Sequence, residues 1–128
     1  MTKSILNRNA TIVNENTTCK GDVLIENDIS KKVGPSIQVT NEDALEIIEA
    51  HGSYLIPGFI DDQVHFREPG LTHKANIATE SRAAIAGGIT TFIEMPNTVP
   101  QATTQALLED KFEIAAKDSY ANYSFMFG

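Results

Sequence analysis

The second half of the sequence alternates strand-like and helix-like segments, and this alternation constrains the fold more than any other feature. "LIPGFID" is a short apolar run, "ANIATESRAAIAGG" has helical spacing, and "ITTFIEM" is β-branched and apolar. "TTQALLEDKFEIAAKD" and "YANYSFMF" then add a helix and a strand. Strand, helix, strand, helix, strand is typical of a parallel sheet with crossover helices. The sequence therefore predicts an α/β unit: either a small complete sheet or the start of an eight-stranded barrel.

Each of these predicted elements has an expected buried side. Residues 55–61 are apolar enough for a strand that is buried on both faces. The first helix is expected to end at Gly87 and Gly88, because glycine favours helix C-termini. The helical faces expected to be apolar are Ile77, Ser81, Ala84 and Ile85 in the first helix and Leu108, Phe112 and Ala115 in the second.

The first half of the sequence is typical of β structure instead. Its strand-like runs are "SILNRNATIV", "DVLIE" and "EIIEAHGSYLIPG". The stretches between them, "NENTTCKG" and "KKVGPSIQVTNED", are rich in turn-forming Gly, Pro, Asn and Asp. We therefore expect a small antiparallel β domain over residues 1–54 and an α/β domain over residues 55–128.

Composition excludes several classes of function. The chain has 128 residues, a net charge of -7 and basic residues without clustering, so nucleic acid is not expected as a partner. It has neither a signal-like apolar stretch nor an apolar run long enough to cross a membrane. The single cysteine, Cys19, cannot form an internal disulfide, which fits a reducing compartment. We expect a soluble cytoplasmic protein.

Polar residues gather after each strand of the predicted parallel sheet. In such folds the active groups lie at the carboxyl ends of the strands, because the strands hold the following loops around one crevice. "DDQVHFR", "EMPNT" and "MFG" occupy these positions. The three clusters are therefore the candidates for a site.

Within the first cluster, Gln63, His65 and Arg67 alternate, so an extended backbone would aim all three side chains in one direction. A neutral imidazole binds zinc, a guanidinium grips a carboxylate with two hydrogen bonds, and a glutamine offers a carboxamide oxygen. A hydrolytic zinc site usually takes three protein ligands. Further ligands would have to come from elsewhere.

Each of these residues also has a structural interpretation. His65 suits a hydrogen-bonded position at a strand end, and Arg67 suits a surface ion pair with a carboxylate such as Glu68. Asn97 suits a turn, and Glu94 suits a polar strand end. The residues alone leave both interpretations open.

A resemblance decides between them. "LIPGFIDDQVHFREPGLTHK", "AAIAGGITTFIEMPNT" and "GDVLIEND" together resemble dihydroorotases of the amidohydrolase superfamily, the long class related to hydantoinases and allantoinases. The resemblance implies the N-terminal part of a TIM (β/α)8 barrel metal-dependent hydrolase, preceded by a small β-sandwich-like domain. It also implies zinc and the reversible hydrolysis of L-dihydroorotate to N-carbamoyl-L-aspartate in pyrimidine biosynthesis.

The motif of this family is Asp-x-His-x-His-x-Arg, with both histidines on zinc and the arginine on the substrate carboxylate. Asp61, His65 and Arg67 match it, and Asn97 matches a substrate-binding asparagine. The resemblance therefore implies His65, Arg67 and Asn97 as substrate-binding residues. It implies His65, with Gln63 in place of the first histidine, as metal-binding residues.

Gln63 leaves three alternatives open: one zinc ion instead of two, a site completed by Gln63 or water, or a non-catalytic scaffold that binds aspartate carbamoyltransferase. The family's bridging lysine, later histidines and catalytic aspartate lie on barrel strands after the third, so no catalytic residue is assigned here. Activity is expected only of the complete chain. A small-molecule substrate and a homodimer are compatible with the resemblance.

Overall fold

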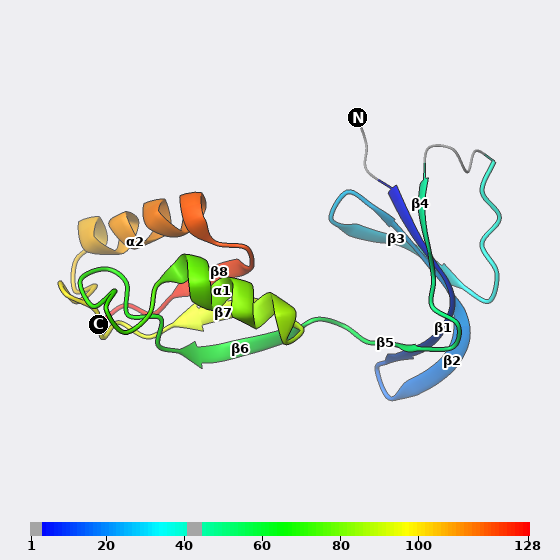
Figure 1. The fold of residues 1–128 in the computed structure, drawn as a ribbon, viewed down its shortest axis with the longest axis horizontal. Coiled ribbons are helices and arrows are strands. Elements are labelled where there is room, and N and C mark those ends of the chain that lie inside the picture. Colours follow the sequence, from blue (N-terminus) through cyan, green and yellow to red (C-terminus); the bar gives the residue numbers. More distant parts are fainter. Residues whose placement is uncertain (1–3, 41–44) are drawn as a thin grey trace. The chain divides into compact units, whose positions relative to one another are not determined.

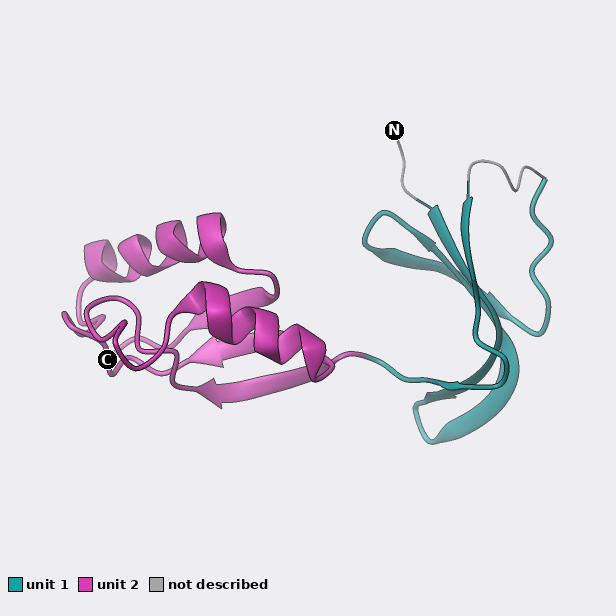
Figure 2. Cartoon of the chain, viewed as in Figure 1, with its two compact units in different colours: residues 1–57 teal, residues 58–128 magenta. Residues whose placement is uncertain are grey.

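The computed structural model describes residues 4–40 and 45–128. The chain divides into two compact units, Met1–Pro57 and Gly58–Gly128 (Figure 2). Residues 1–3 of the expected first domain and residues 41–43 of an expected connection lie outside the described residues.

The first unit is a five-stranded sheet with the order β3-β2-β1-β4, in which β5 also pairs with β1 (Figure 1). β1 pairs antiparallel with β2, and β2 pairs antiparallel with β3. β4 and β5 pair parallel with β1, so the expectation of a wholly antiparallel unit is wrong. The strands are β1 Ser4–Asn14, β2 Thr17–Glu26, β3 Ile29–Gly34, β4 Leu45–Glu49 and β5 Tyr54–Leu55.

Two connections predicted in this unit are shorter than expected. Only Glu15 and Asn16, both with positive φ, separate β1 from β2. A two-residue loop with positive φ at both positions matches the twist of the flanking strands. The first turn therefore ends before Thr17, earlier than predicted. β3 also covers the start of the second stretch that the sequence predicts to be turn. β3 is an exposed edge strand carrying two lysines, so it lacks the apolar pattern that marks a strand.

The core of the first unit contains Leu6, Ala10, Val23 and Ile37. Asp22 is buried beside them, and its carboxylate accepts the N–H groups of Asn9 at 3.0 Å and Ile37 at 2.9 Å. This pairing satisfies the backbone where β1 shifts register against β2.

The second unit confirms the predicted α/β order. Its three strands are parallel and have the order β6-β7-β8. The elements are β6 Phe59–Val64, α1 Ile77–Ala86, β7 Ile89–Glu94, α2 Gln105–Asp118 and β8 Asn122–Phe125.

Both helices begin at a capping side chain. Asn76 accepts the N–H of Thr79 at 2.8 Å, and Thr104 accepts the N–H of Leu107 at 3.3 Å. α1 ends at Gly87, as predicted, and Gly88 follows with a φ of 88°.

The predicted helical faces are correct only in part. Ile77 and Ser81 are buried in α1, whereas Ile85 is 42% exposed. In α2 the buried residues are Lys111 and Ala115, whereas Phe112 is 39% exposed. The buried face of α2 therefore includes Lys111 in place of the predicted Phe112.

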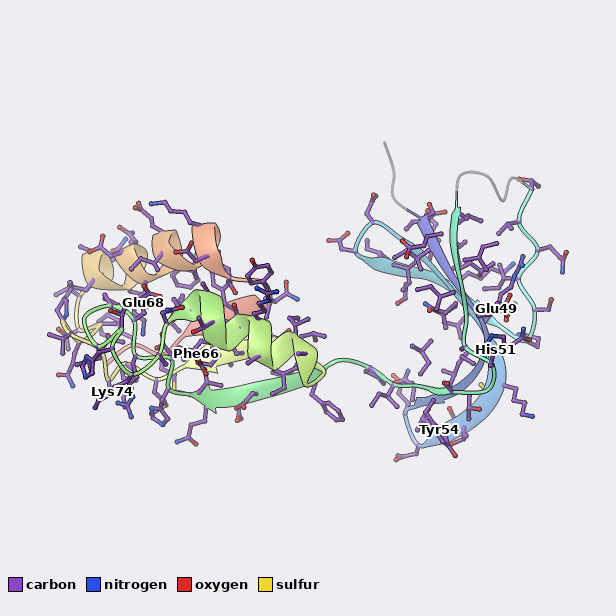
Figure 3. All side chains as sticks on the ribbon, in the orientation of Figure 1. Glu49, His51, Tyr54, Phe66, Glu68 and Lys74 are labelled. Atoms are coloured by element: carbon purple, nitrogen blue, oxygen red, sulfur yellow. The ribbon has the colours of Figure 1, made fainter. Side chains whose placement is uncertain are left out.

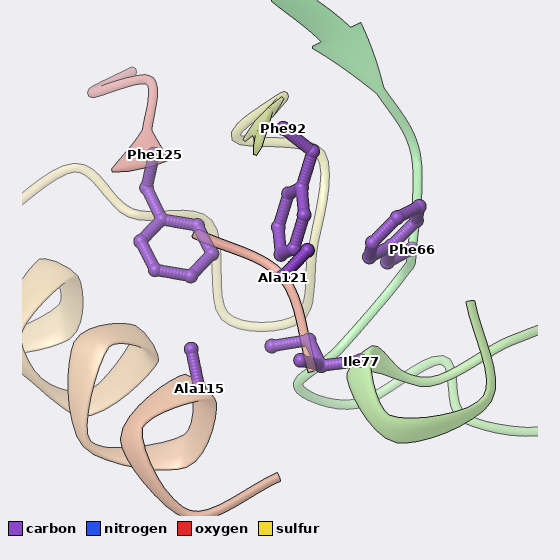
Figure 4. Close-up of a cluster of buried hydrophobic side chains, with 6 residues drawn as sticks. All are labelled: Phe66, Ile77, Phe92, Ala115, Ala121 and Phe125. Atoms are coloured by element: carbon purple, nitrogen blue, oxygen red, sulfur yellow. The ribbon is translucent and has the colours of Figure 1, made fainter. Parts of the chain in front are cut away.

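The core of the second unit lies between the sheet and the helices (Figure 4). Phe66 and Phe92 pack with ring centroids 4.5 Å apart. β6 was expected to be buried on both faces, but Phe59 is 58% and Ile60 67% exposed. β6 is an edge of this three-stranded sheet, so no described strand lies beyond it to cover these side chains. The buried cluster comprises Phe66, Ile77, Phe92, Ala115, Ala121 and Phe125.

Candidate functional site

The carboxyl ends of β6, β7 and β8 lie together. Because the three strands are parallel and adjacent, their C-terminal loops emerge at one edge of the sheet. The N–H of Met95 donates to the carbonyl of Val64 at 3.0 Å, and the N–H of Met126 donates to that of Glu94 at 2.9 Å. The three predicted clusters are therefore neighbours in space.

A β-bulge lies within the first cluster, before His65. Asp61 pairs with Phe92 and Val64 pairs with Glu94, so β6 contains one residue more than β7 over this interval. The N–H of Gln63 donates to the carboxylate of Asp61 at 3.1 Å within the bulge. Bulges bend a strand and redirect its side chains.

The expected alternation of Gln63, His65 and Arg67 is wrong. Gln63 lies in the bulge, β6 ends at Val64, and Arg67 has a left-handed backbone with a φ of 70°. A single extended segment therefore does not carry all three side chains. Neither the bulge nor the left-handed residue was predictable from the sequence, because neither involves glycine.

His65 and Asn97 are brought together, although 32 residues separate them. The imidazole Nδ1 lies 3.1 Å from the carboxamide Oδ1 and 2.9 Å from Nδ2 of Asn97. If Nδ1 donates to Oδ1, the other ring nitrogen carries the lone pair and can bind a metal; if Nδ1 instead accepts from Nδ2, the other ring nitrogen carries the proton. The contact links the cluster after β6 with the cluster after β7.

The backbone of Arg67 is held in place, whereas its guanidinium has no partner among the described residues. The N–H of Arg67 donates to Oε1 of Glu94 at 2.8 Å. No described residue makes a hydrogen bond or an ion pair with the guanidinium. Glu68, the partner suggested by the structural interpretation, instead accepts the N–H of Ile77 at 2.8 Å. Phe66 and Glu68, which precede and follow Arg67 in the sequence, are labelled in Figure 3.

The loop after β6 packs closely against the loop after β7. The N–H of Val99 donates to the carbonyl of Pro69 at 3.1 Å. Gly70 has a φ of 86°, and a Cβ at this position would overlap the carbonyl oxygen of Val99. Only glycine suits both the backbone and the space. This packing fixes the loop that carries Arg67 against the loop that carries Asn97.

A depression of about 430 Å³ borders Asn97. It is shallow and open to solvent over most of its extent, and neither His65 nor Arg67 lines it. Its lining residues are Leu71, Asn97, Thr98, Val99, Pro100 and Gln101.

A buried ion pair lies beneath the site, and the sequence did not predict it. Glu94 and Lys111 are 0% and 1% exposed, and Lys111 Nζ lies 3.0 Å from Oε2 of Glu94. The two groups attract each other by charge, but Oε2 of Glu94 has no hydrogen-bond partner among the described residues. Burial raises the pKa of the Glu94 carboxyl, while Lys111 and the N–H of Arg67 act in the opposite direction. The spacing of Lys111 from Leu108 and Ala115 was the available sign, since all three share a helical face.

The described residues do not assemble a group that could hold a metal ion by itself. No group of three or more His, Cys, Asp or Glu side chains occurs among residues 4–40 and 45–128. His65 offers one imidazole nitrogen and Gln63 a carboxamide oxygen, fewer than the three protein ligands of a catalytic zinc site. These two residues fit a metal only if other ligands complete the set.

Comparison with solved structures defines the class. The L-hydantoinase (dihydropyrimidinase) of Arthrobacter aurescens matches with a TM-score of 0.89 and 26% identity, over 100% of this chain and 28% of that one. A D-hydantoinase (dihydropyrimidinase) from Thermus sp. matches with a TM-score of 0.79 and 30% identity, over 96% of this chain and 27% of that one. The fold is the N-terminal part of a (β/α)8-barrel cyclic amidohydrolase, preceded by a small β domain.

Sequence comparison narrows the class to one family. Residues 52–121 match the dihydro-orotase-like family model, and the chain belongs to this family. The dihydroorotase of Methanosarcina acetivorans is 40% identical over 91% of this chain and 24% of its own length. That of Carboxydothermus hydrogenoformans is 46% identical over 75% of this chain and 22% of its own length.

The chain thus spans about a quarter of the length of these relatives. Membership of the family implies a metal cofactor and a small-molecule substrate. None of the helices in the described part of the chain is long and apolar enough to cross a membrane.

Proposed function

We propose that these residues form the N-terminal part of a zinc-dependent dihydroorotase, which reversibly hydrolyses L-dihydroorotate to N-carbamoyl-L-aspartate in pyrimidine biosynthesis. The observation that carries the proposal is the 40% identity to a dihydroorotase over nine-tenths of the chain. The His65–Asn97 contact at the strand ends supports it, as does the guanidinium of Arg67, with which no described residue pairs.

Arg67 and Asn97 are the proposed substrate-binding residues, together with His65. Dihydroorotate carries a carboxylate beside its ring amide, and a guanidinium can bind a carboxylate with two parallel hydrogen bonds. Asn97 adds a carboxamide that can donate to the same group. Holding the carboxylate fixes the ring relative to the reacting carbonyl, which is a positioning effect.

Zinc is the proposed metal, with His65 and Gln63 as its ligands from this part of the protein. Zinc bound by these residues would lower the pKa of a water molecule and polarise the scissile carbonyl. The carboxamide of Gln63 is a weaker donor than imidazole, so one metal ion is the simplest occupancy. We further propose a cytoplasmic location and a homodimer, which sedimentation of the purified protein would test.

The test of this function is a steady-state assay of the complete protein with dihydroorotate and, separately, with hydantoin, which lacks the carboxylate. The proposal expects kcat/KM to be at least about 100-fold higher for dihydroorotate, because a site that pairs a substrate group discriminates against analogues without it. Chelation should abolish turnover, and zinc should restore it. Equal or greater turnover of hydantoin would contradict the proposal.

A further inference from the structure

We infer that the buried Glu94–Lys111 pair is a positioning device for Arg67, acting through the backbone N–H of Arg67. The inference rests on the proposed function, in which Arg67 binds the substrate carboxylate. Neither member of the pair is among the residues proposed to bind substrate or metal.

The first step of the argument is the backbone of Arg67. Its φ of 70° is a left-handed conformation that costs free energy for any residue except glycine. Such a conformation persists only when neighbouring groups hold it. Two hydrogen bonds do so: the N–H of Arg67 donates to Glu94 Oε1 at 2.8 Å, and its carbonyl accepts the N–H of Leu71 at 3.1 Å.

The second step is the direction of the side chain. The Cα–Cβ bond of a residue turns with its backbone, so a return of φ to negative values would swing the guanidinium away from its position. Phe66 is anchored in the core against Phe92, so the residue preceding Arg67 cannot follow such a rotation freely. The bond to Glu94 is therefore the contact that selects one orientation.

The third step is the way Glu94 itself is held. Lys111 Nζ lies 3.0 Å from Glu94 Oε2, donates to the carbonyl of Met95 at 3.3 Å and stands 4.8 Å from the centroid of the Phe125 ring. These contacts tie α2, β7 and β8 to one carboxylate. Its second oxygen is thereby left facing Arg67.

Stability does not account for two buried charges at this place. Replacing a buried ion pair by apolar side chains of similar volume is often neutral or stabilising. An apolar pair would offer no acceptor for the N–H of Arg67. We therefore infer that the role of Glu94 is to hold this backbone amide.

Two double variants of the complete protein separate the acceptor from the charge. E94Q/K111M removes both charges and keeps an oxygen for the Arg67 N–H, whereas E94L/K111M removes the oxygen as well. We expect KM for dihydroorotate to be at least about tenfold higher in E94L/K111M than in E94Q/K111M, with kcat values within about twofold of each other. Equal KM values in the two variants would overturn the inference.

Ser81→Ala is the matched control for a purely structural role. Ser81 is also fully buried, and its hydroxyl accepts the N–H of Tyr120 at 3.1 Å, away from Arg67. Its loss should lower the melting temperature without changing KM. A rise in KM in Ser81→Ala as large as that in E94L/K111M would show that KM follows stability alone, and would also overturn the inference.

Hydrogen exchange of the Arg67 amide tests the bond to Glu94 in the wild-type protein. This measurement needs neither an activity assay nor a folded E94L/K111M variant. In the wild-type protein this amide should exchange slowly, like the bonded amides of β7. Exchange at the rate of an open loop amide would refute the anchor. Absence of dihydroorotate turnover in the wild-type protein would refute the proposed function, and with it the substrate-related role of the anchor. Slow exchange of the Arg67 amide in the wild type, lost in E94L/K111M, would still show that Glu94 holds the amide.

Discussion

At the residue scale, Gln63 is the weaker of the two metal ligands that we propose. The motif that the sequence resembles has a histidine at this position, and this chain has a carboxamide inside a β-bulge. A carboxamide oxygen is a neutral and weak zinc donor, whereas imidazole is a common ligand. The bulge nevertheless keeps the position beside Asp61, whose carboxylate accepts the Gln63 N–H.

Restoring the histidine should therefore increase metal binding. We expect Gln63→His to raise the zinc content of the purified complete protein by up to about one ion per chain. Asp62→His is the matched control, because it places an imidazole one residue away in the same bulge. Metal analysis by mass spectrometry measures both. An unchanged zinc content in Gln63→His would show that Gln63 already binds the metal or that no second metal position exists.

Glu94 predicts a specific dependence of stability on pH. Burial raises the pKa of its carboxyl above the ordinary value of 4.5, so the folded state binds this proton more tightly than the unfolded state. The contribution of Glu94 to stability is then full below pH 4.5 and is lost as pH rises through the raised pKa.

The melting temperature of the wild-type protein minus that of E94Q/K111M measures this contribution. We expect the difference to fall as pH rises above 4.5, through the raised pKa of Glu94. A difference that grows with pH over this range would mean that the pKa of Glu94 is lowered on folding, and that the ion pair outweighs the burial of the carboxyl.

At the element scale, the site depends on how the loop after β6 packs on the loop after β7. Gly70 is the point of closest approach, because its Cα faces the carbonyl of Val99. Any side chain there must push the loops apart. Since one loop carries Arg67 and the other carries Asn97, their separation should disturb substrate binding.

Gly70→Ala should accordingly lower kcat/KM for dihydroorotate by about tenfold or more. Gly52→Ala is the matched control: Gly52 has a φ of 83°, close to the 86° of Gly70, but has open space around it. Both variants carry the backbone strain of a left-handed alanine, about 1 kcal/mol or more. Only Gly70→Ala adds the overlap with Val99. An equal effect of the two variants on kcat/KM would contradict the importance of the loop contact.

The elements of the second unit were predictable because their signals are local. Capping residues and the Gly87–Gly88 pair set the helix ends, and β-branched runs mark β7. β3 was missed because an exposed edge strand has no apolar pattern. The inward face of α2 was misjudged because Lys111 reads as a surface residue, and only its pairing with Glu94 in three dimensions allows its burial.

The candidate site was predictable in its residues and not in its geometry. Parallel strands bring the ends of β6 and β7 together, so the proximity of His65 and Asn97 follows from the fold class. The bulge before His65 and the left-handed backbone of Arg67 do not follow from it. Both depend on carboxylates, those of Asp61 and Glu94, that bond to backbone N–H groups at the strand ends.

At the scale of the whole molecule, the fold defines a position for chemistry without completing it. The second unit has the strand order of the start of a barrel, and the chain spans about a quarter of the length of its dihydroorotase relatives. The described residues include a guanidinium, an imidazole and two carboxamides near the strand ends, but no group of three metal-binding side chains. Carboxylate binding by Arg67 is the role that we propose for this part of the protein.

The most direct test of this account is KM for dihydroorotate in the Arg67→Lys variant of the complete protein. Lysine keeps the charge and loses the two-point grip, so we predict a KM at least about tenfold above that of the wild type, with kcat within about twofold. Arg82→Lys, which changes an exposed arginine of α1, should leave KM at the wild-type value. An unchanged KM in Arg67→Lys would contradict the central claim that this arginine binds the substrate carboxylate.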